Sequence, residues 1–467
     1  MGTVSALDSL LSSSSSSSSI DLSSILEAAY GASSSGLDVT AAVNSAITAA
    51  RAPEQAWETQ ESTLQSQESA LTQIQTDATN LDNDVQALNS LTGPLSARTV
   101  TSSNSSVVSA SAASGTTSGN HVVVVNDLAT TASWTSGTYA TSSTALPATS
   151  FTITTGSGSS TTITTDGTET LDDVANQINS DNLGVTASVI TDATGSRLAI
   201  VADTSGSTAN FTVSGAGLSG LGFTQAATGA NASLTVDGIT ISSASNTVTG
   251  VVPGLTLNLL SADPGVQVSL GVAPDTSQVT SAINQFVTDY NTVISDLSSQ
   301  FTFSGTSQGV LADDPTVRNL QSAVLDALDY TSGGSTISNL SSLGVTVDDE
   351  GKLSVNSSSL QSALQNNFSD VQTFFQGTSL NGFANSLDQQ LTNFISPGDG
   401  AFTVDLQSMS SQYSDLQTDI SNFETNYITP LQTQLQSEYS QAEILLQQLP
   451  VEMQQINTEL GENNTKS

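Results

Sequence analysis

The spacing of apolar residues changes twice along this chain, from a helical pattern to a strand pattern and back again. In the first helical stretch, apolar residues advance by alternating steps of three and four: Leu71, Ile74, Ala78, Leu81, Val85 and Leu88. Such spacing places them in one narrow stripe of an amphipathic helix. Residues 406–460 have similar spacing. We therefore expect a long helix near each end of the chain, the first of which ends at Gly93-Pro94.

The second stripe contains a stretch that advances only by four: Phe423, Tyr427, Leu431, Leu435 and Tyr439. Such a stutter locally unwinds a left-handed supercoil. Pro430 lies within this stretch, and Pro450 lies further along the same stripe. Because proline removes a helical hydrogen bond and clashes with the preceding turn, the sequence predicts a kink or break at Pro430 and an interruption at Pro450.

Between residues 100 and 273 short β-branched runs alternate with Gly, Asp and Asn, which is typical of strands. The clearest runs are residues 121–125, 151–155, 185–190, 198–202, 232–236, 247–252 and 255–260. One short helix interrupts them, with Leu171, Val174 and Ile178 on its inner face. The middle of the chain is therefore an insertion of β structure between helical ends.

Four further elements are predicted outside this insertion. A short helix ends near Arg51, before Pro53, and another helix spans residues 279–297. A third begins at Pro315 with Asp314 as its cap. Residues 343–355 predict a hairpin whose acidic turn is residues 348–350.

The predicted fold class is multidomain α+β, in which N- and C-terminal helices form a coiled-coil or helical-bundle leg and a β-rich two-domain head is inserted. A chain of 467 residues is too long for a single core. The expected parts are terminal stalk helices that are only partly ordered before assembly, a helical leg domain, an inner head domain and an outer head domain. The stalk comprises residues 1–55 and 421–467, and the leg domain comprises residues 56–100 and 275–420. The inner head domain comprises residues 101–130 and 228–274, and the outer head domain comprises residues 131–227.

Composition excludes several functional classes. The chain has 43 acidic and 6 basic residues, a formal charge of −37, so nucleic-acid binding is not expected. It has no cysteine and one histidine, which leaves little for catalysis or metal binding. No run approaches the roughly 20 apolar residues that span a bilayer. We expect no enzyme, no catalytic residue, no cofactor, no metal and no membrane insertion.

The N-terminus has no Sec-type signal, because residues 1–11 contain no Lys or Arg and their apolar residues are scattered. Residues 12–19 are all serine, which predicts a mobile tether. If the protein is secreted, we expect a route without a cleavable signal peptide.

Several residues are candidates for contacts between subunits, as scarce cations or as members of a helical stripe: Arg51, Trp57, Arg98, Arg318, Leu416, Ile420 and Phe423. The alternatives are a solvated arginine, which contributes about 0–1 kcal/mol, and ordinary bundle packing. His121 is expected to be an ordinary edge residue without a Ser or Asp arrangement, and Trp134 is left undecided.

An ordered set of motifs along nearly the whole chain resembles the flagellar hook-associated protein 2 family, FliD. Its members here are residues 35–39 with 51–54, 121–129, 168–203, 234–239, 246–248, 252–257, 286–291, 343–345 and 349–353. Each motif is short, but their order and spacing match together. Two departures are the small number of Lys and Arg in the terminal helices and the presence of Pro450.

The resemblance implies a structural cap at the distal tip of the bacterial flagellar filament, where exported flagellin folds and is inserted. It also implies a homo-oligomeric ring, a pentamer as first choice with the subunit number left open. Flagellin, hook-associated proteins and the flagellar type III export apparatus with its chaperone are the implied partners. The implied location is extracellular, at the filament tip. The alternatives are an adhesin whose head binds a surface, and another axial flagellar protein of the hook-filament junction.

Overall fold

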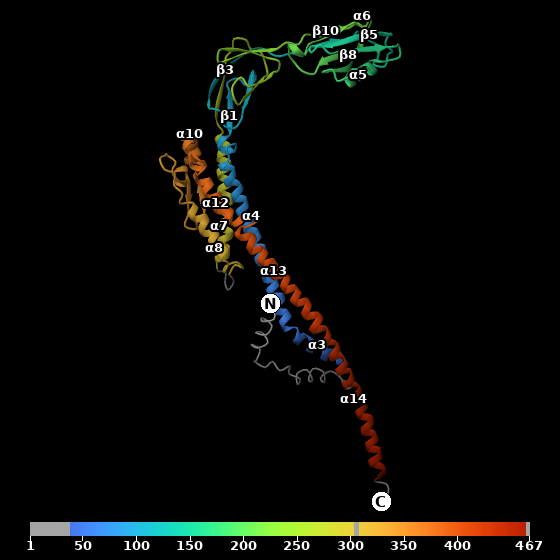
Figure 1. Cartoon of the computed structure of the whole chain (residues 1–467), viewed down its shortest axis with the longest axis vertical. Coiled ribbons are helices and arrows are strands. Elements are labelled where there is room, and N and C mark those ends of the chain that lie inside the picture. The colour runs from blue at the N-terminus through green and yellow to red at the C-terminus, as the bar shows by residue number, and fades with distance from the viewer. Residues whose placement is uncertain (1–37, 303–307, 464–467) are drawn as a thin grey trace. The chain divides into compact units, whose positions relative to one another are not determined.

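The computed structural model describes residues 38–302 and 308–463, which form two compact units (Figure 1). The leg unit contains the described residues of Met1–Asp82, Asp289–Asp326 and Gln389–Ser467. The head unit contains Asn83–Thr288 and Ala327–Asp388. The predicted serine tether lies outside the described residues. No helix within the described ranges is both long and apolar enough to cross a membrane.

Helices form both ends of the described chain, and the predicted α+β class with helical termini and a β-rich centre is confirmed. The α-helices outside the β-rich region are α3 Val39–Ala50, α4 Ala52–Asn89, α7 Thr276–Phe301, α8 Pro315–Ala327, α9 Leu340–Leu343, α10 Ser357–Asn366, α11 Phe368–Gln376, α12 Phe383–Ile395, α13 Ala401–Phe423 and α14 Thr429–Asn463. A 3₁₀ turn, η1 Pro94–Ser96, follows α4, and a π turn, η3 Glu424–Ile428, joins α13 to α14.

Local chemistry accounts for the ends of the first helices. The Asp38 side chain accepts a hydrogen bond from the backbone N–H of Ala41 at 3.0 Å, which caps α3. Arg51 follows α3, and α4 then begins at Ala52 with Pro53 in its first turn, where proline is tolerated. A Cβ on Gly93 would lie 2.1 Å from the carbonyl oxygen of Ala87, so only glycine fits where the chain leaves α4.

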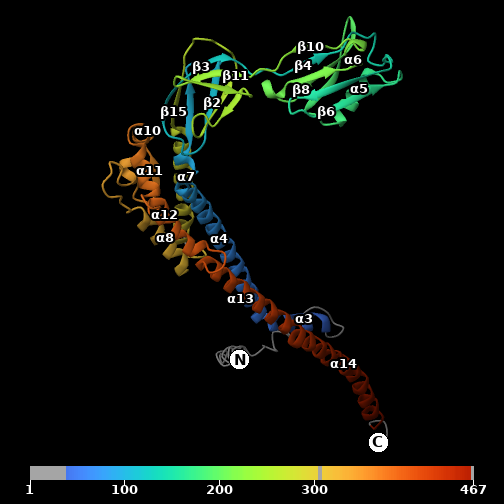
Figure 2. The same cartoon turned by 45° about the horizontal axis from the view of Figure 1, so that its top comes forward.

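In the leg unit, α4 and α13 are antiparallel neighbours, as Figures 1 and 2 both show. Gln65 donates to the Tyr413 hydroxyl at 2.9 Å, and Gln417 donates to Glu61 at 3.0 Å, so positions ascend on one helix as they descend on the other. The predicted stripe is buried: the leg core includes Leu71, Ile74, Ala78, Leu81, Val293, Leu297, Leu320, Val324, Leu391 and Phe402.

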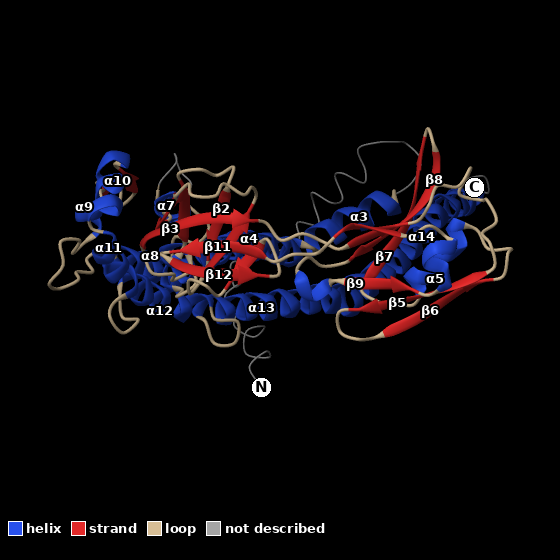
Figure 3. Ribbon diagram, turned by 90° about the horizontal axis from the view of Figure 1, so that it is seen from above, coloured by secondary structure: helices blue, strands red, loops and turns tan. Residues whose placement is uncertain are grey.

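The strands of the head unit lie in two separate groups (Figure 3), each with its own hydrophobic core. The strand pairs are antiparallel. The inner core lies between a five-stranded sheet, β1-β15-β3-β11-β12, and a three-stranded sheet, β13-β14-β2. The strands are β1 Arg98–Ser102, β2 Val108–Ala112, β3 Gly119–Asp127, β11 Ala232–Val236, β12 Ile239–Ser243, β13 Thr247–Thr249, β14 Leu255–Leu259 and β15 Val268–Pro274. Alternate residues of β3, β11 and β14 point into this core.

The outer core lies among a four-stranded sheet, β10-β4-β8-β7, a three-stranded sheet, β6-β5-β9, and helix α5. The elements are β4 Ser133–Thr135, β5 Thr149–Thr155, β6 Ser160–Thr165, α5 Leu171–Ser180, β7 Val185–Asp192, β8 Gly195–Ala202, η2 Ser207–Ala209, β9 Phe211–Ser214, α6 Ala216–Gly220 and β10 Thr224–Ala227. Thr170 and Asp173 form a capping box at the start of α5, and its predicted inner face is buried.

The rest of the head unit is helical, with the short hairpin β16 Val345–Val347 and β17 Leu353–Val355. Its core contains a cluster of aromatic rings, in which Phe374 stacks on Phe383 at 5.4 Å between centroids. Gln376, only 3% exposed, donates to the carbonyl oxygens of Leu88 and Ser90 at the end of α4.

The predicted interruption of the helix at Pro450 is wrong. Helix α14 continues through Pro450, whose neighbours Leu449 and Val451 are 50% and 62% exposed. The carbonyl that loses its partner there can bond to water, which lowers the cost of the interruption. At Pro430 the sequence predicted a kink or break; the chain stays helical, and the α-helical pattern is interrupted by the π turn η3, which immediately precedes α14.

Two carboxyl groups meet between α4 and α7 in the leg unit. Desolvation by burial, together with the hydrogen bond and charge of Asp77, raises the pKa of Asp296 to about 6. An unfolded aspartate titrates near 3.9. Protonated Asp296 therefore stabilises the folded state relative to its ionised form. This contribution to the free energy of unfolding is complete below pH ~4 and is lost as the pH rises through about 6.

We expect the substitution Asp296→Asn to stabilise the leg unit at pH 7.5, by about 1 kcal/mol after allowance for solvent screening, and to change little at pH 4. Urea unfolding of the full chain across this pH range measures the effect. Asp326→Asn, at an exposed position of α8, is the matched control. An equal effect of Asp296→Asn at both pH values would contradict the raised pKa of Asp296.

Candidate functional site: the helix junction at Arg51

Arg51 links three segments of the leg unit. Its Nη1 donates to Oε2 of Glu54 on α4 at 2.6 Å, and its Nη2 donates to Oε1 of Glu424 on η3 at 2.7 Å. The hydrogen bonds from Glu424 and Glu54 raise the pKa of the Arg51 guanidinium above its ordinary value. The side chain of Glu54 is 10% exposed and that of Glu424 is 41% exposed. Arg51 thus neutralises a carboxylate from each end of the chain at the point where α3 turns into α4.

Aromatic side chains continue the junction beside this ion pair. Trp57 of α4 meets Phe423 of α13 edge to face, with ring centroids 5.4 Å apart and planes at 88°. Phe423 in turn stacks on Tyr427 at 5.2 Å. Such pairs add about 0.5–1.5 kcal/mol beyond the area that they bury. They therefore help to hold α4 and α13 together at the end of their shared length.

A small apolar cluster lies beyond the rings. Ile428 is fully buried with Val43 and Ile47 of α3. Half-buried residues of α14 extend this contact: Leu431, Leu435 and Tyr439. Helix α3 therefore covers the first turns of α14, and Figures 1 and 2 show the two helices side by side.

A cavity of about 350 Å³ opens beside the junction. It is lined by Glu54, Glu61, Gln417, Ile420, Ser421, Glu424 and Thr425. Among the described residues, no group of three or more His, Cys, Asp or Glu side chains is placed to hold a metal ion. The arrangement serves helix packing, and the described residues here include no cysteine or histidine that could act as a nucleophile or general base.

The structure brings five of the seven predicted contact residues to one side of the leg unit. Arg51, Trp57 and Phe423 form the junction itself, Ile420 lines its cavity, and Leu416, 8% exposed, lies one turn earlier on α13. The contacts seen here lie within one chain. A role of these residues between subunits therefore stays a prediction.

The other two predicted residues lie elsewhere. Arg98, on β1 of the head unit, donates to the carbonyl oxygens of Thr116 and Ala97 at 2.8 and 2.9 Å. Arg318, on α8 of the leg unit, donates to the carbonyl oxygen of Asp313 at 2.8 Å. Each bond uses only part of a guanidinium that has five donors. An intersubunit role for these two arginines likewise stays a prediction.

Sequence reasoning missed the acidic partner of His121. His121 was expected to have no Asp arrangement, but its Nδ1 lies 2.7 Å from Oδ2 of Asp237, whose Oδ1 accepts from the backbone N–H of Val122. These contacts lower the pKa of Asp237, with the His121 hydrogen bond as the largest cause. Asp237 and Gly238 both have positive φ in the turn between β11 and β12, so the Asp-Gly dipeptide was the available signal.

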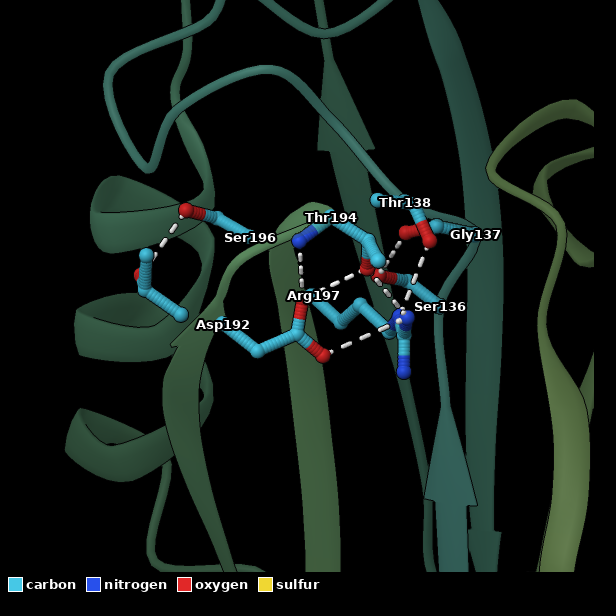
Figure 4. A network of polar contacts seen from close by, with 8 residues as sticks. Ser136, Gly137, Thr138, Asp192, Thr194, Ser196 and Arg197 are labelled. Carbon is cyan, nitrogen blue, oxygen red and sulfur yellow. Dashed lines mark hydrogen bonds and ion pairs between the residues drawn. The ribbon is translucent and has the colours of Figure 1, made fainter.

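Arg197 is a second residue that sequence reasoning missed, and Figure 4 shows its network of polar contacts. It donates to the hydroxyls of Thr138 and Thr194, both at 2.9 Å, and lies 3.5 Å from Asp192. Asp192 also accepts from the backbone N–H of Thr194 at 2.7 Å. The network thus fixes the turn between β7 and β8 to the segment after β4, and its polar groups are used within the chain.

The remaining candidates have structural roles. Asp314 accepts from the N–H of Thr316 at 2.7 Å, so it caps α8 as predicted. Asp348 accepts from the N–H groups of Glu350 and Lys352, which confirms the hairpin tip. Trp134 lies in β4, donates to the carbonyl oxygen of Phe211 at 3.2 Å and packs on the outer core.

Three family models match the chain in sequence order. The N-terminal model of flagellar hook-associated protein 2 matches residues 35–132, and its C-terminal model matches residues 229–450. Between them, the flagellin hook IN motif matches residues 150–204. The two terminal models together therefore surround the outer head.

Curated relatives and solved structures agree with these models. The lateral flagellar hook-associated protein 2 of Vibrio parahaemolyticus is 31% identical over 188 residues, which cover 39% of this chain and 41% of that protein. The B-type flagellar hook-associated protein 2 of Pseudomonas aeruginosa is 28% identical over 388 residues, 73% of this chain and 76% of that protein. The crystal structure of the D1-D2-D3 domains of the flagellar cap protein FliD from Escherichia coli matches with a TM-score of 0.60 and 27% identity. That match covers 73% of this chain and 99% of the crystallised chain.

We expect Arg51→Gln to lower the free energy of unfolding of the leg unit by about 1 kcal/mol, because two carboxylates lose their cation while remaining partly solvated. A double-mutant cycle with Glu424→Gln should give a coupling energy of about 0.5–1 kcal/mol. Arg318→Gln, which removes a single bond to a backbone carbonyl, is the control and should change stability less. If the effects of Arg51→Gln and Glu424→Gln on the free energy of unfolding were strictly additive, the two side chains would not be coupled and the ion pair would not stabilise the junction.

Proposed function

The chain belongs to the flagellar hook-associated protein 2 family, and we propose that it is the structural cap at the distal tip of a bacterial flagellar filament. In this role it promotes folding and insertion of exported flagellin subunits, prevents their loss, and is needed for filament elongation and motility. The observation that most supports the proposal is the match of both terminal family models on the two sides of an inserted β head. No enzymatic step is part of this role.

The leg supplies surfaces that suit such an assembly. Beyond the α3 contact, α14 has a row of apolar side chains at steps of three and four: Leu446, Leu449, Met453 and Ile456. These four are 44–59% exposed. Large apolar side chains in water favour a partner. This row supports contacts with further copies of the chain or with filament subunits.

We further propose the domain division predicted from the sequence, with terminal stalk helices, a leg domain, and inner and outer head domains at the stated boundaries. The two separate hydrophobic cores of the head support the last two. The inner core draws on residues 107–129 and 232–272, and the outer core on residues 132–223.

The proposed assembly is a homo-oligomeric ring, a pentamer as first choice, that contacts flagellin and hook-associated proteins. Its proposed location is extracellular, at the filament tip, after export by the flagellar type III apparatus and its chaperone without a cleavable signal peptide. Adhesion is the less favoured role. The exposed large apolar residues of the described β head are all aliphatic: Val122, Ile190, Ile239, Leu260 and Val266. Aromatic platforms, which are common anchors at binding surfaces, are not among them.

A strain that lacks this chain should release monomeric flagellin into the medium and build short filaments or none. Expression of the full chain should restore long filaments, whereas a chain truncated after Tyr439 should fold and fail to restore them. Filament length by electron microscopy and flagellin in the culture supernatant measure the result. Normal elongation in the deletion strain would exclude the cap role.

Ring assembly should strengthen with salt, because copies with a formal charge of −37 repel one another. The screening length falls from about 10 Å at 0.1 M salt to about 3 Å at 1 M. Sedimentation of the full chain across a salt series, with and without a divalent cation, measures the assembly. A steady weakening of assembly as salt rises would show that attractive ion pairs dominate instead.

A further inference from the structure

The π turn η3 contains one residue more than an α-helix would use at the same place. The backbone N–H of Thr429 donates to the carbonyl oxygen of Glu424, five residues earlier, instead of four. Each residue of an α-helix turns the chain by about 100°. The extra residue would therefore rotate everything after it, unless the helix widened locally to absorb it.

The burial of neighbouring side chains shows that the extra residue is absorbed. In an uninterrupted helix, Tyr427 would follow Phe423 in the apolar stripe, since it lies four residues further on. In the structure Tyr427 is 52% exposed and Ile428 is fully buried against α3. The stripe therefore takes one step of five at η3 and then resumes steps of three and four.

The apolar stripe keeps the same angular position around the helix, its phase, after the α3 contact ends. Counted in steps of three and four from Ile428, the stripe runs through Leu431, Leu435 and Tyr439 and then reaches the exposed row Leu446, Leu449, Met453 and Ile456. At about 100° per residue, all of these positions lie within about 50° of one line along the helix. One face of α14 is thus partly covered by α3 and partly exposed.

Two features hold the π turn in place. Pro430 has no N–H to donate, so an α-helical bond to the carbonyl of Asn426 cannot form, and π turns are one of the known accommodations of such a gap. Glu424, the first residue of η3, is bonded to Arg51 at 2.7 Å. The ion pair fixes the turn at its start and the proline lies just beyond its end.

We propose that η3 is a phase-keeping joint, which aligns the exposed row of α14 with the side of the leg that α3 occupies, and that capping depends on this alignment. The proposal rests on the proposed function and adds to it a requirement on helix phase. If capping needed only a stable or a long α14, the direction in which the exposed row faces would not matter.

Length variants separate phase from length. One alanine inserted after Tyr439 leaves the α3 contact intact but rotates the exposed row by about 100°. A duplicate of residues 433–439 inserted at the same place adds seven residues, yet it rotates the row by only about 20°. In the strain lacking the natural chain, we expect the single insertion to reduce filament length at least tenfold. The longer insertion should restore most of that length. Equal activity of both variants, or lower activity of the longer one, would overturn the proposal.

The joint can also be tested in the isolated full chain, which has no cysteine of its own. We expect a maleimide to label Tyr427→Cys at least tenfold faster than Ile428→Cys. Deletion of Thr425 should turn the π turn into an α-helix of unchanged phase, so that the labelling order is kept and filaments still elongate. Rapid labelling of the Ile428→Cys side chain in the deletion variant would show that η3 does not keep phase.

Two readouts distinguish this proposal from the cap role itself. If the unaltered chain fails to restore filaments, the cap role is wrong, while the labelling order still tests the joint. If the unaltered chain restores filaments and the single insertion does as well, the cap role stands and the phase requirement is wrong. Because the insertions lie beyond the α3 contact, each variant should fold. Circular dichroism and thermal unfolding check this.

Discussion

The antiparallel pairing of the two ends of the chain is the constraint on which the leg unit depends. Helix α4 carries one narrow apolar stripe and few ion pairs, so it cannot bury enough surface alone. Contacts between residues some 350 positions apart, such as Gln65 with Tyr413 and Trp57 with Phe423, close the chain on itself. The β head is therefore an insertion between two partners that need each other.

Charge limits what else can hold this chain together. With 43 acidic and 6 basic residues, favourable ion pairs are few. The described arginines all donate to groups of their own chain, and Arg51 serves two carboxylates at once. Most side-chain bonds of the head are instead made by Thr, Ser and Asn. Neutral hydrogen bonds add modest stability each and do not add repulsion. Such a surface leaves assembly to apolar rows and to screening by salt.

Sequence reasoning predicted elements well where periodicity was regular. The strand runs at residues 121–125 and 198–202, the inner face of α5, the cap at Asp314 and the hairpin tip at Asp348 are all present in the structure. It failed where a decision depended on a distant neighbour. His121 was assigned no acidic partner because Asp237 lies 116 residues away, across β3 and the turn after β11. Pro450 was expected to interrupt a helix that, being exposed there, tolerates it.

The sequence by itself determined the helical ends, the β-rich centre and the elements with regular spacing, because side-chain spacing and proline or glycine positions act over a few residues. It also determined the family, through an ordered set of short motifs. Only the tertiary structure decided that Glu424 pairs with Arg51, and that Ile428 instead of Tyr427 faces α3. The burial of Ile428 depends on a single extra residue in η3, and which side of a helix faces its partner is a property of their packing, which no local pattern contains.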